Sequence, residues 1–150
     1  MTIKNNQKID NSKDEIKLEL VGRSDCRFLY TLLKQRDPKA NISHKMLPTF
    51  QEHVRFVLSR PYSKWYTIRI QNKKIGSIYL SRHDEIGIFL GKKYQKSGIG
   101  RKALVMLMKK NQKRRYLANI SPKNYKSIKF FKKNGFKLIQ YTYELIPVKT

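Results

Sequence analysis

Two glycines lie close together in Gln95-Lys96-Ser97-Gly98-Ile99-Gly100, between an apolar run over residues 85–90 and a helical pattern that extends to about Lys110. Glycine lets the backbone approach a ligand closely, and the first turn of a helix presents amide groups that lack internal partners. The positive end of the helix dipole lies at the same place. This segment therefore predicts a binding site for a phosphorylated ligand.

Three types of nucleotide-binding loop were compared with this segment. The Walker pattern Gly-x4-Gly-Lys-Ser/Thr is absent from the chain. The dinucleotide pattern Gly-x-Gly-x-x-Gly/Ala matches the run from Gly98 to Ala103, but it requires an acidic residue roughly 20 positions later to bind a ribose hydroxyl. No acidic residue follows until Glu144, and the elements before the loop predict antiparallel hairpins. A dinucleotide site is therefore disfavoured, and the third type, an acetyl-CoA loop, depends on the wider sequence pattern described below.

The composition is strongly basic, with 34 Lys and Arg against 10 Asp and Glu and a net charge of +24. Such a charge favours partners that are polyanions: nucleic acid, acidic membrane or a phosphorylated cofactor. A basic proteome would explain the excess equally well. The half of the chain that contains the glycine segment is the more positive half, because residues 86–143 include no Asp or Glu.

The remaining composition predicts a cytoplasmic protein without a membrane partner. No apolar run approaches the length of a membrane span, and the N-terminus lacks the apolar core of a signal peptide. The single cysteine, Cys26, cannot form an internal disulfide, which suits a reducing compartment. We expect no metal site, a flexible polar tail over residues 1–15 and one domain over residues 16–150.

Hydrophobic periodicity predicts a mixed α/β fold (α+β) with a mostly antiparallel central sheet and four helices. The expected order is β-α-α-β-β-β-α-β-α-β. Strands are expected at residues 16–20, 65–70, 75–80, 85–90, 116–120 and 136–145, and helices at about 25–34, 49–59, 99–110 and 125–133.

The glycine segment and its surroundings resemble the Gcn5-related N-acetyltransferases (GNAT). Their loop pattern, Gln/Arg-x-x-Gly-x-Gly/Ala, is matched by residues 95–100. A strand that starts with Glu85 precedes the loop, Asn124 stands where the family has an asparagine, and Phe130 to Phe136 is similar to the family's apolar–Tyr–x–x–x–Gly–Phe. The resemblance covers about residues 16–145. It implies a GNAT-like sheet that is splayed at the cofactor strand, and an acyltransferase that uses acetyl-CoA.

The resemblance also implies a cofactor site. The backbone of residues 88–90 would pair with the pantetheine arm, and one amide there would polarise the thioester carbonyl. These apolar side chains equally suit a core, and Asn124 equally suits a helix cap with Ser127 at the third helical position. The expected cofactor-binding residues are Ile88, Phe89, Leu90, Gln95, Lys96, Ser97, Gly98, Ile99, Gly100, Arg101, Asn124, Ser127 and Phe131.

Attack of an amine on a thioester needs a route for the proton of the amine and help for the leaving thiolate. Glu85 is the best candidate base, although a surface carboxylate paired with lysines would look the same in sequence, and His83 is a second candidate. The family's tyrosine position holds Phe131, which cannot donate a proton. Tyr94, Tyr125 or water could serve instead, or the thiolate could leave unaided.

The acceptor is expected to be a small amine, a nucleotide-linked amino sugar or a protein amine. Its site should involve the first two helices and the strand after them, where aromatic residues are also typical of a core. The candidate acceptor-binding residues are His53, Tyr62, Trp65, Tyr66 and His83. The alternative function is a basic nucleic-acid-binding or ribosome-binding protein with secondary or no catalysis. The sequence leaves open whether the protein is a monomer or a homodimer.

Overall fold

A computed structural model describes residues 15–42 and 46–149 of the chain. The regular elements are β1 (Ile16–Leu20), α1 (Cys26–Gln35), α2 (Phe50–Leu58), β2 (Lys64–Ile70), β3 (Lys73–Leu80), β4 (Ile86–Leu90), α3 (Ile99–Lys110) and α4 (Tyr125–Lys133). Short 3-10 turns lie at Arg23–Asp25, Pro38–Ala40 and Lys92–Tyr94. Within the described ranges, no helix combines the length and the apolar character needed to cross a bilayer. The expected tail over residues 1–15 lies almost wholly outside the described residues.

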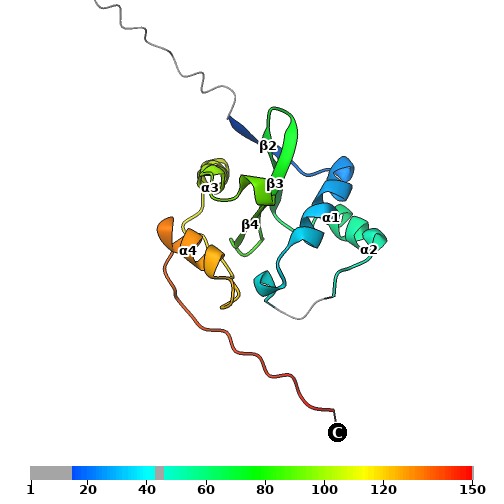
Figure 1. Cartoon of the computed structure of the whole chain (residues 1–150). Helices are drawn as coiled ribbons and strands as arrows, with labels where there is room; N and C mark the ends of the chain where they lie inside the picture. The colour runs from blue at the N-terminus through cyan, green and yellow to red at the C-terminus, as the bar shows by residue number, and fades with distance from the viewer. Residues whose placement is uncertain (1–14, 43–45, 150) are drawn as a thin grey trace, which may run out of the picture.

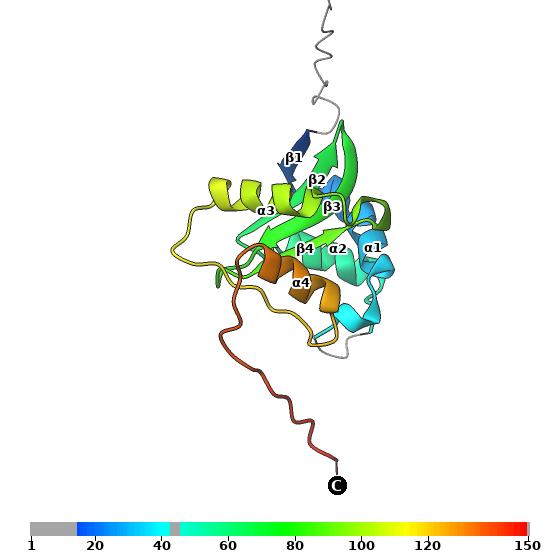
Figure 2. The same cartoon turned by 60° about the vertical axis from the view of Figure 1, so that its left-hand side comes forward.

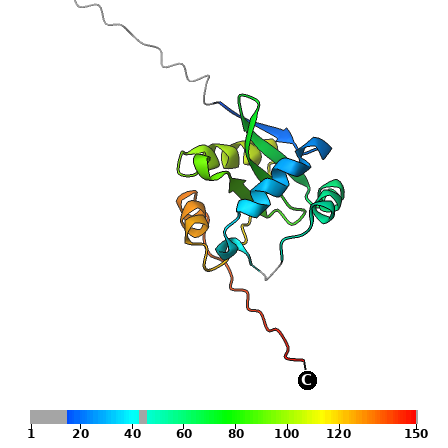
Figure 3. The same ribbon diagram turned by 45° about the vertical axis from the view of Figure 1, so that its right-hand side comes forward.

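The four strands form one antiparallel sheet in the order β1-β2-β3-β4. Helices α1 and α2 lie on one side of this sheet, and α3 and α4 lie on the other (Figures 1 and 2). In Figure 3, α1 lies in front of the strands. The expected mixed α/β class, the antiparallel meander and the four helices are confirmed.

Each face of the sheet has its own apolar core, because successive strand residues point to opposite faces. The larger core joins α3 to the strands and includes Ile68, Ile78 and Leu104, all fully buried. The smaller core joins α1 to α2 and is packed against Trp65 and Phe89. Apolar strand residues on each face of the sheet therefore determine where the two layers of helices pack.

A buried carboxylate fixes the start of α1 to the β2–β3 hairpin. Asp25 accepts a hydrogen bond from the Gly22 amide at 2.8 Å and lies 2.7 Å from Lys74 Nζ and 3.4 Å from Arg69 Nη2. Its side chain is almost fully buried, so these partners must offset the cost of removing the charge from water. This cluster ties the first helix to a hairpin that lies far along the chain.

Two strands expected from the sequence do not form. Residues 116–120 make a single parallel bridge, between Leu117 and Glu85, and continue without regular pairing. Residues 136–145 have a clear strand alternation, but the described chain supplies no neighbouring strand to pair with them. The alternation of apolar and polar residues indicates which face a strand would bury. A strand forms only if its backbone groups also find a partner, which the alternation does not specify.

We expect His53 to make the protein less stable in acid. His53 lies on α2, 5% exposed and close to the Tyr30 ring, and its Nε2 has no hydrogen-bond partner among residues 15–42 and 46–149. Burial lowers the pKa of His53 below its ordinary value of 6.5. As the pH falls below that value, the unfolded chain takes up a proton that the folded chain resists, so the free energy of unfolding decreases.

The test is urea unfolding of the wild type and of His53→Leu between about pH 7.5 and about pH 5. On acidification, the free energy of unfolding of His53→Leu should decrease less than that of the wild type. The exposed control His83→Leu should show the same decrease as the wild type. Equal pH dependence in the wild type and His53→Leu would contradict this prediction.

Candidate active site

The glycine segment forms a tight turn between β4 and α3. Lys96 and Gly98 both adopt positive φ, 62° and 80°, and Gly98 is the N-cap residue directly before α3. A left-handed conformation is unfavourable for most side chains, so a glycine is well suited to position 98. No other atom lies within 4 Å of where a Cβ on Gly98 would be, so the surface above this turn is open.

The side chains of the segment hold the turn in place. Gln95 Nε2 donates to the Leu90 carbonyl at 3.1 Å, and Ser97 Oγ donates to the Tyr94 carbonyl at 2.5 Å. Gly100 faces α4, where an added Cβ would come within 3.1 Å of the Phe130 ring. The side chains of Gln95 and Ser97, which are expected to bind a cofactor, therefore also fix the turn.

The N-terminus of α3 has no side-chain cap. Its first main-chain hydrogen bond runs from Lys102 N to Gly98 O at 3.3 Å, which leaves the amides of residues 99–101 ahead of the helical ladder. Lys96 and Arg101 are exposed beside them. Uncapped amides, the positive end of the helix dipole and two cations are features that favour a phosphate group.

On the outer edge of β4, the side away from β3, backbone pairing with the described chain ends before this turn. Alternate residues of an antiparallel strand direct their backbone groups away from their partner, and on β4 these are residues 86, 88 and 90. Ile86 N donates to Leu117 O at 2.7 Å, and Leu90 O accepts from Gln95. For Ile88, the described chain supplies no partner on that side.

At the start of β4, Glu85 carries the carboxylate expected as a base. Its side chain accepts a hydrogen bond from Asn119 Nδ2, and its amide donates to Ser81 Oγ at 3.1 Å. His83 lies in the same turn, exposed to solvent, and its amide also donates to Ser81 Oγ. Asn119 was not expected as a site residue, because nothing in the sequence places it opposite a residue 34 positions earlier.

Tyr79 is a second residue that the sequence analysis missed. Its ring crosses β4 at Gly87, where an added Cβ would overlap the ring. It stacks on Tyr62 with ring centroids 3.8 Å apart. Burial raises the pKa of both phenols, and Glu85 raises that of Tyr79 further although Arg36 opposes it. Gly87 was the available signal in the sequence, since a glycine inside a strand often marks a place where another group approaches the backbone closely.

The expected acceptor residues lie on both sides of the sheet. Trp65 packs edge-on against Phe56 and Tyr62, on the face that carries Tyr79. Tyr66 points to the other face, where it is buried in the larger core and its hydroxyl accepts from Asn111 Nδ2 at 3.2 Å. Adjacent strand residues cannot share a face, so the expectation that Tyr66 joins Trp65 in one acceptor site is wrong. His53 lies between helices α1 and α2, as described above.

The expected residues of α4 have structural roles. Asn124 caps the helix, with its Oδ1 accepting from Ser127 N at 3.2 Å. Phe131 is buried and packs edge-on against Phe130 and Phe136. Phe131 therefore helps to hold α4 and, through Phe130, the start of α3.

Tyr94 lies at the far end of β4 from Glu85. The five residues of that strand span about 17 Å at 3.4 Å per residue. Tyr94 packs at the larger core, with Lys73 Nζ 5.9 Å from its ring centroid. The structure therefore does not bring together the two residues expected to share catalysis, and Tyr94 is a poor candidate for the proton donor.

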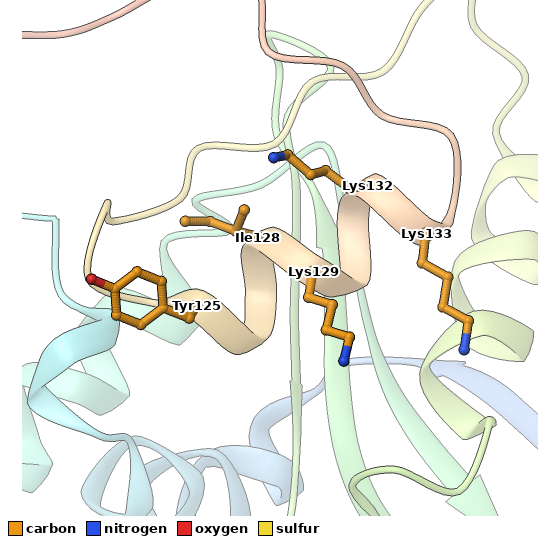
Figure 4. Close-up of a pocket in the computed structure, with 5 residues that line it drawn as sticks. All are labelled: Tyr125, Ile128, Lys129, Lys132 and Lys133. Carbon is orange, nitrogen blue, oxygen red and sulfur yellow. The ribbon is translucent and has the colours of Figure 1, made fainter.

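A shallow basic recess of about 610 Å³ lies along α4. Its lining residues come from this helix alone, and Figure 4 shows Tyr125 and Ile128 next to three lysines, Lys129, Lys132 and Lys133. The glycine turn and Glu85 do not line this recess, so it is separate from the site built around β4.

The family model of the Acetyltransferase (GNAT) family matches residues 27–136. No curated protein sequence matches the chain. The solved structures that resemble it include a domain from Methanocaldococcus jannaschii DSM 2661, with 26% identity, a TM-score of 0.74 and coverage of 87% of this chain and 93% of that one.

Two further solved structures show the same fold. An acetyltransferase from Thermus thermophilus has 19% identity and a TM-score of 0.71, with 85% of this chain and 90% of that chain covered. RimL, a ribosomal L7/L12 alpha-N-protein acetyltransferase in complex with coenzyme A, has 21% identity and a TM-score of 0.67, with 83% and 81% covered.

The match includes β4, the glycine turn, α3 and α4, which are the elements that build the site described above. The uncapped start of α3 and the unpaired edge at Ile88 suit an extended ligand with a phosphorylated end. The chain therefore belongs to the Acetyltransferase (GNAT) family and is an N-acetyltransferase that uses acetyl-CoA.

Proposed function

We propose that the protein transfers an acetyl group from acetyl-CoA to a primary amine by direct attack of the amine on the thioester. The observation that carries this proposal is the unpaired outward backbone of Ile88. It lies between the Leu117 bridge on one side and the uncapped start of α3 on the other. An extended ligand that pairs with Ile88 would have its phosphates toward α3 and its reactive end toward Glu85.

Acetyl-CoA, when bound, supplies the activated acetyl group. The amides of residues 98–101 would hold its pyrophosphate, and the exposed side chains of Lys96 and Arg101 would add favourable charge. The Ile88 amide would donate a hydrogen bond to the thioester carbonyl, where negative charge develops during attack. The turn needs no rearrangement for this role, because Gln95 and Ser97 already fix it.

Glu85 would receive the proton of the attacking amine, directly or through a water. The hydrogen bond from Asn119 orients its carboxylate at the start of β4. Next to it, Tyr79 and Tyr62 would form a wall of the acceptor site, together with Trp65. Tyrosine hydroxyls with the ordinary pKa of 10.0 are already neutral at physiological pH, and burial raises the pKa of both residues further. Phe131 donates no proton, so the thiolate would be protonated by Tyr125 or by water, or would leave unaided.

The acceptor would be a primary amine that fits between the aromatic wall and Glu85. RimL is named as acting on a ribosomal protein N-terminus, and another structure of this fold is a spermidine N-acetyltransferase chimera from Vibrio cholerae and hSSAT. Both small amines and protein amines are thus acceptors within this fold. An acetyl-transfer screen over polyamines, amino sugars, amino acids and peptides, measured by release of free thiol, tests the proposal. Failure of every amine to increase thiol release would contradict it.

Gly98→Asp should weaken acetyl-CoA binding by at least about tenfold, because its carboxylate would lie in the open space above the turn and repel the pyrophosphate. Asp tolerates the left-handed conformation better than most residues, so the fold should be retained. Gly135→Asp is a matched control, since Gly135 also has positive φ, 90°, and open space around it. Isothermal titration with acetyl-CoA provides the measurement, and an equal loss in both variants would contradict the assignment of the turn.

Glu85→Gln should lower kcat by about a hundredfold or more, the usual contribution of a positioned base, without changing acetyl-CoA affinity. Glutamine retains an acceptor for Asn119, so the local structure should be preserved. Asp84→Asn is the control, since it removes the neighbouring carboxylate, which lies 3.5 Å from Lys113 and not at Asn119. Unchanged turnover in Glu85→Gln would remove this residue from the catalytic role.

A further inference from the structure

The net positive charge of this chain is unevenly distributed over the fold. Residues 86–143 carry 16 Lys and Arg and no Asp or Glu, in a chain with a net charge of +24. This span forms β4, α3 and α4, and the two helices cover the same side of the sheet (Figures 1 and 2). Such a distribution produces a directional field, which attracts polyanions to the side that carries α3 and α4.

Helix α4 carries four of these charges within nine residues. Lys126, Lys129, Lys132 and Lys133 are all exposed, and the first turn of the helix has no acidic residue. Residues three or four apart on a helix are neighbours, so Lys129 lies beside each of the other three lysines. Like charges at this spacing destabilise a helix, and Lys126 also lies at the positive end of the helix dipole. An anionic partner would relieve this repulsion.

No carboxylate compensates the charge of α4 within the part of the chain that the structure describes. None of the four lysines has an ion-pair partner there. The nearest acidic residues before the basic span have other partners, since Asp84 pairs with Lys113 and Glu85 accepts a hydrogen bond from Asn119. The lysines of α4 can therefore bind a partner outside the chain.

The basic face of α4 points away from the glycine turn. Phe131 is buried, and Phe130 packs on Gly100 at the start of α3. With about 3.6 residues per turn, Tyr125 and Lys129 lie on the opposite side of the helix from these two rings. They line the shallow recess shown in Figure 4. The recess is therefore a surface distinct from the acetyl-CoA site.

An exposed aromatic ring lies among the lysines of this recess. Tyr125 is 76% exposed and borders the recess together with Ile128 and three lysines (Figure 4). Its side chain has no hydrogen bond or ring contact with any described residue. A cluster of cations beside a free aromatic ring suits a single-stranded nucleic acid, because phosphates can meet the cations while a base stacks on the ring.

The same features favour single-stranded RNA over other polyanions. A duplex keeps its bases stacked, so it would use the lysines and not the ring, whereas the loops, bulges and ends of RNA present unstacked bases. An acidic membrane takes up an amphipathic helix by its apolar face, and on α4 that face is packed against the protein through Phe131.

We propose that the outer face of α4 binds single-stranded RNA, with Lys129, Lys132 and Lys133 at the phosphates and Tyr125 stacked on a base. Because this face is distinct from the acetyl-CoA site, the protein would hold RNA and its cofactor at the same time. The proposal goes beyond acetyl transfer and does not depend on which amine accepts the acetyl group.

The first test is the affinity for a fluorescent RNA of about 12 nucleotides, alternating C and A so that it cannot pair with itself, measured by anisotropy over a range of salt. Lys129→Gln/Lys133→Gln should reduce the slope of log K against log salt by about 1.4, since each phosphate contact of a single strand contributes about 0.7. The matched control, Lys17→Gln/Arg55→Gln, removes the same charge from exposed positions on β1 and α2. Equal changes in both double variants would overturn the assignment to α4.

Substitutions of Tyr125 test the stacking. Tyr125→Ala should weaken RNA binding by at least about fivefold without changing the salt slope. Tyr125→Phe should bind like the wild type, because stacking uses the ring and not the hydroxyl. Wild-type affinity in Tyr125→Ala, or tighter binding of an RNA duplex of the same length, would show binding by charge alone and would contradict the proposal.

Acetyl-CoA distinguishes this surface from the cofactor site. The affinity for acetyl-CoA, measured by isothermal titration, should be the same in the wild type and in Lys129→Gln/Lys133→Gln, and saturating acetyl-CoA should leave RNA bound. Displacement of RNA by acetyl-CoA would show that these lysines hold the cofactor, and would overturn the proposal.

Two further outcomes overturn the RNA surface without affecting the proposed function. One is a wild type that has no affinity for the RNA at low salt. The other is binding to phosphatidylserine vesicles in place of RNA, which would make an acidic membrane the partner. RNA binding without transfer of acetyl groups to any amine would instead contradict the proposed function and leave the RNA surface in place.

Discussion

The point at which the sheet stops pairing is the constraint on which the rest of this structure depends. β4 is hydrogen-bonded along its inner side to β3, but on its outer side Leu117 satisfies only the first position. Beyond that bridge no described residue pairs with the outer side, and the amide and carbonyl of Ile88 have no partner among the residues that the structure describes. Because a buried strand edge must find partners, this opening is stable only beside solvent or a ligand.

The glycine turn lies at the end of this open edge and is fixed to it. The side chain of Gln95 donates a hydrogen bond to the carbonyl of Leu90, the last residue of β4, so the end of the strand and the turn are held together. Phe130 of α4 packs on Gly100, and it is held in turn by the aromatic contacts of Phe131. Phe131 thus offers no hydroxyl group but supplies the aromatic packing that helps to set the position of α3.

The face of the sheet opposite α3 contains the acceptor side of the proposed reaction. Gly87 has no side chain, which lets the Tyr79 ring cross β4 between Glu85 and Phe89. The same alternation that brings Tyr79, Trp65 and Glu85 to this face sends Tyr66 to the other one. Strand register therefore decides which aromatic residues can meet an acceptor. The strong positive charge does not take part in this choice.

The amino-acid sequence by itself determined the family, the mixed α/β class, most helix and strand positions and the glycine turn, because these depend on local spacing and periodicity. It could not reveal the hydrogen bond between Asn119 and Glu85, since that depends on how two distant segments lie beside each other. Nor could it reveal the Tyr79 ring over Gly87, since that depends on the register between β3 and β4. It also predicted strands at 116–120 and 136–145, where the alternation is present and the pairing is not. Only the tertiary structure decided this, because a strand needs a partner that its own residues do not specify.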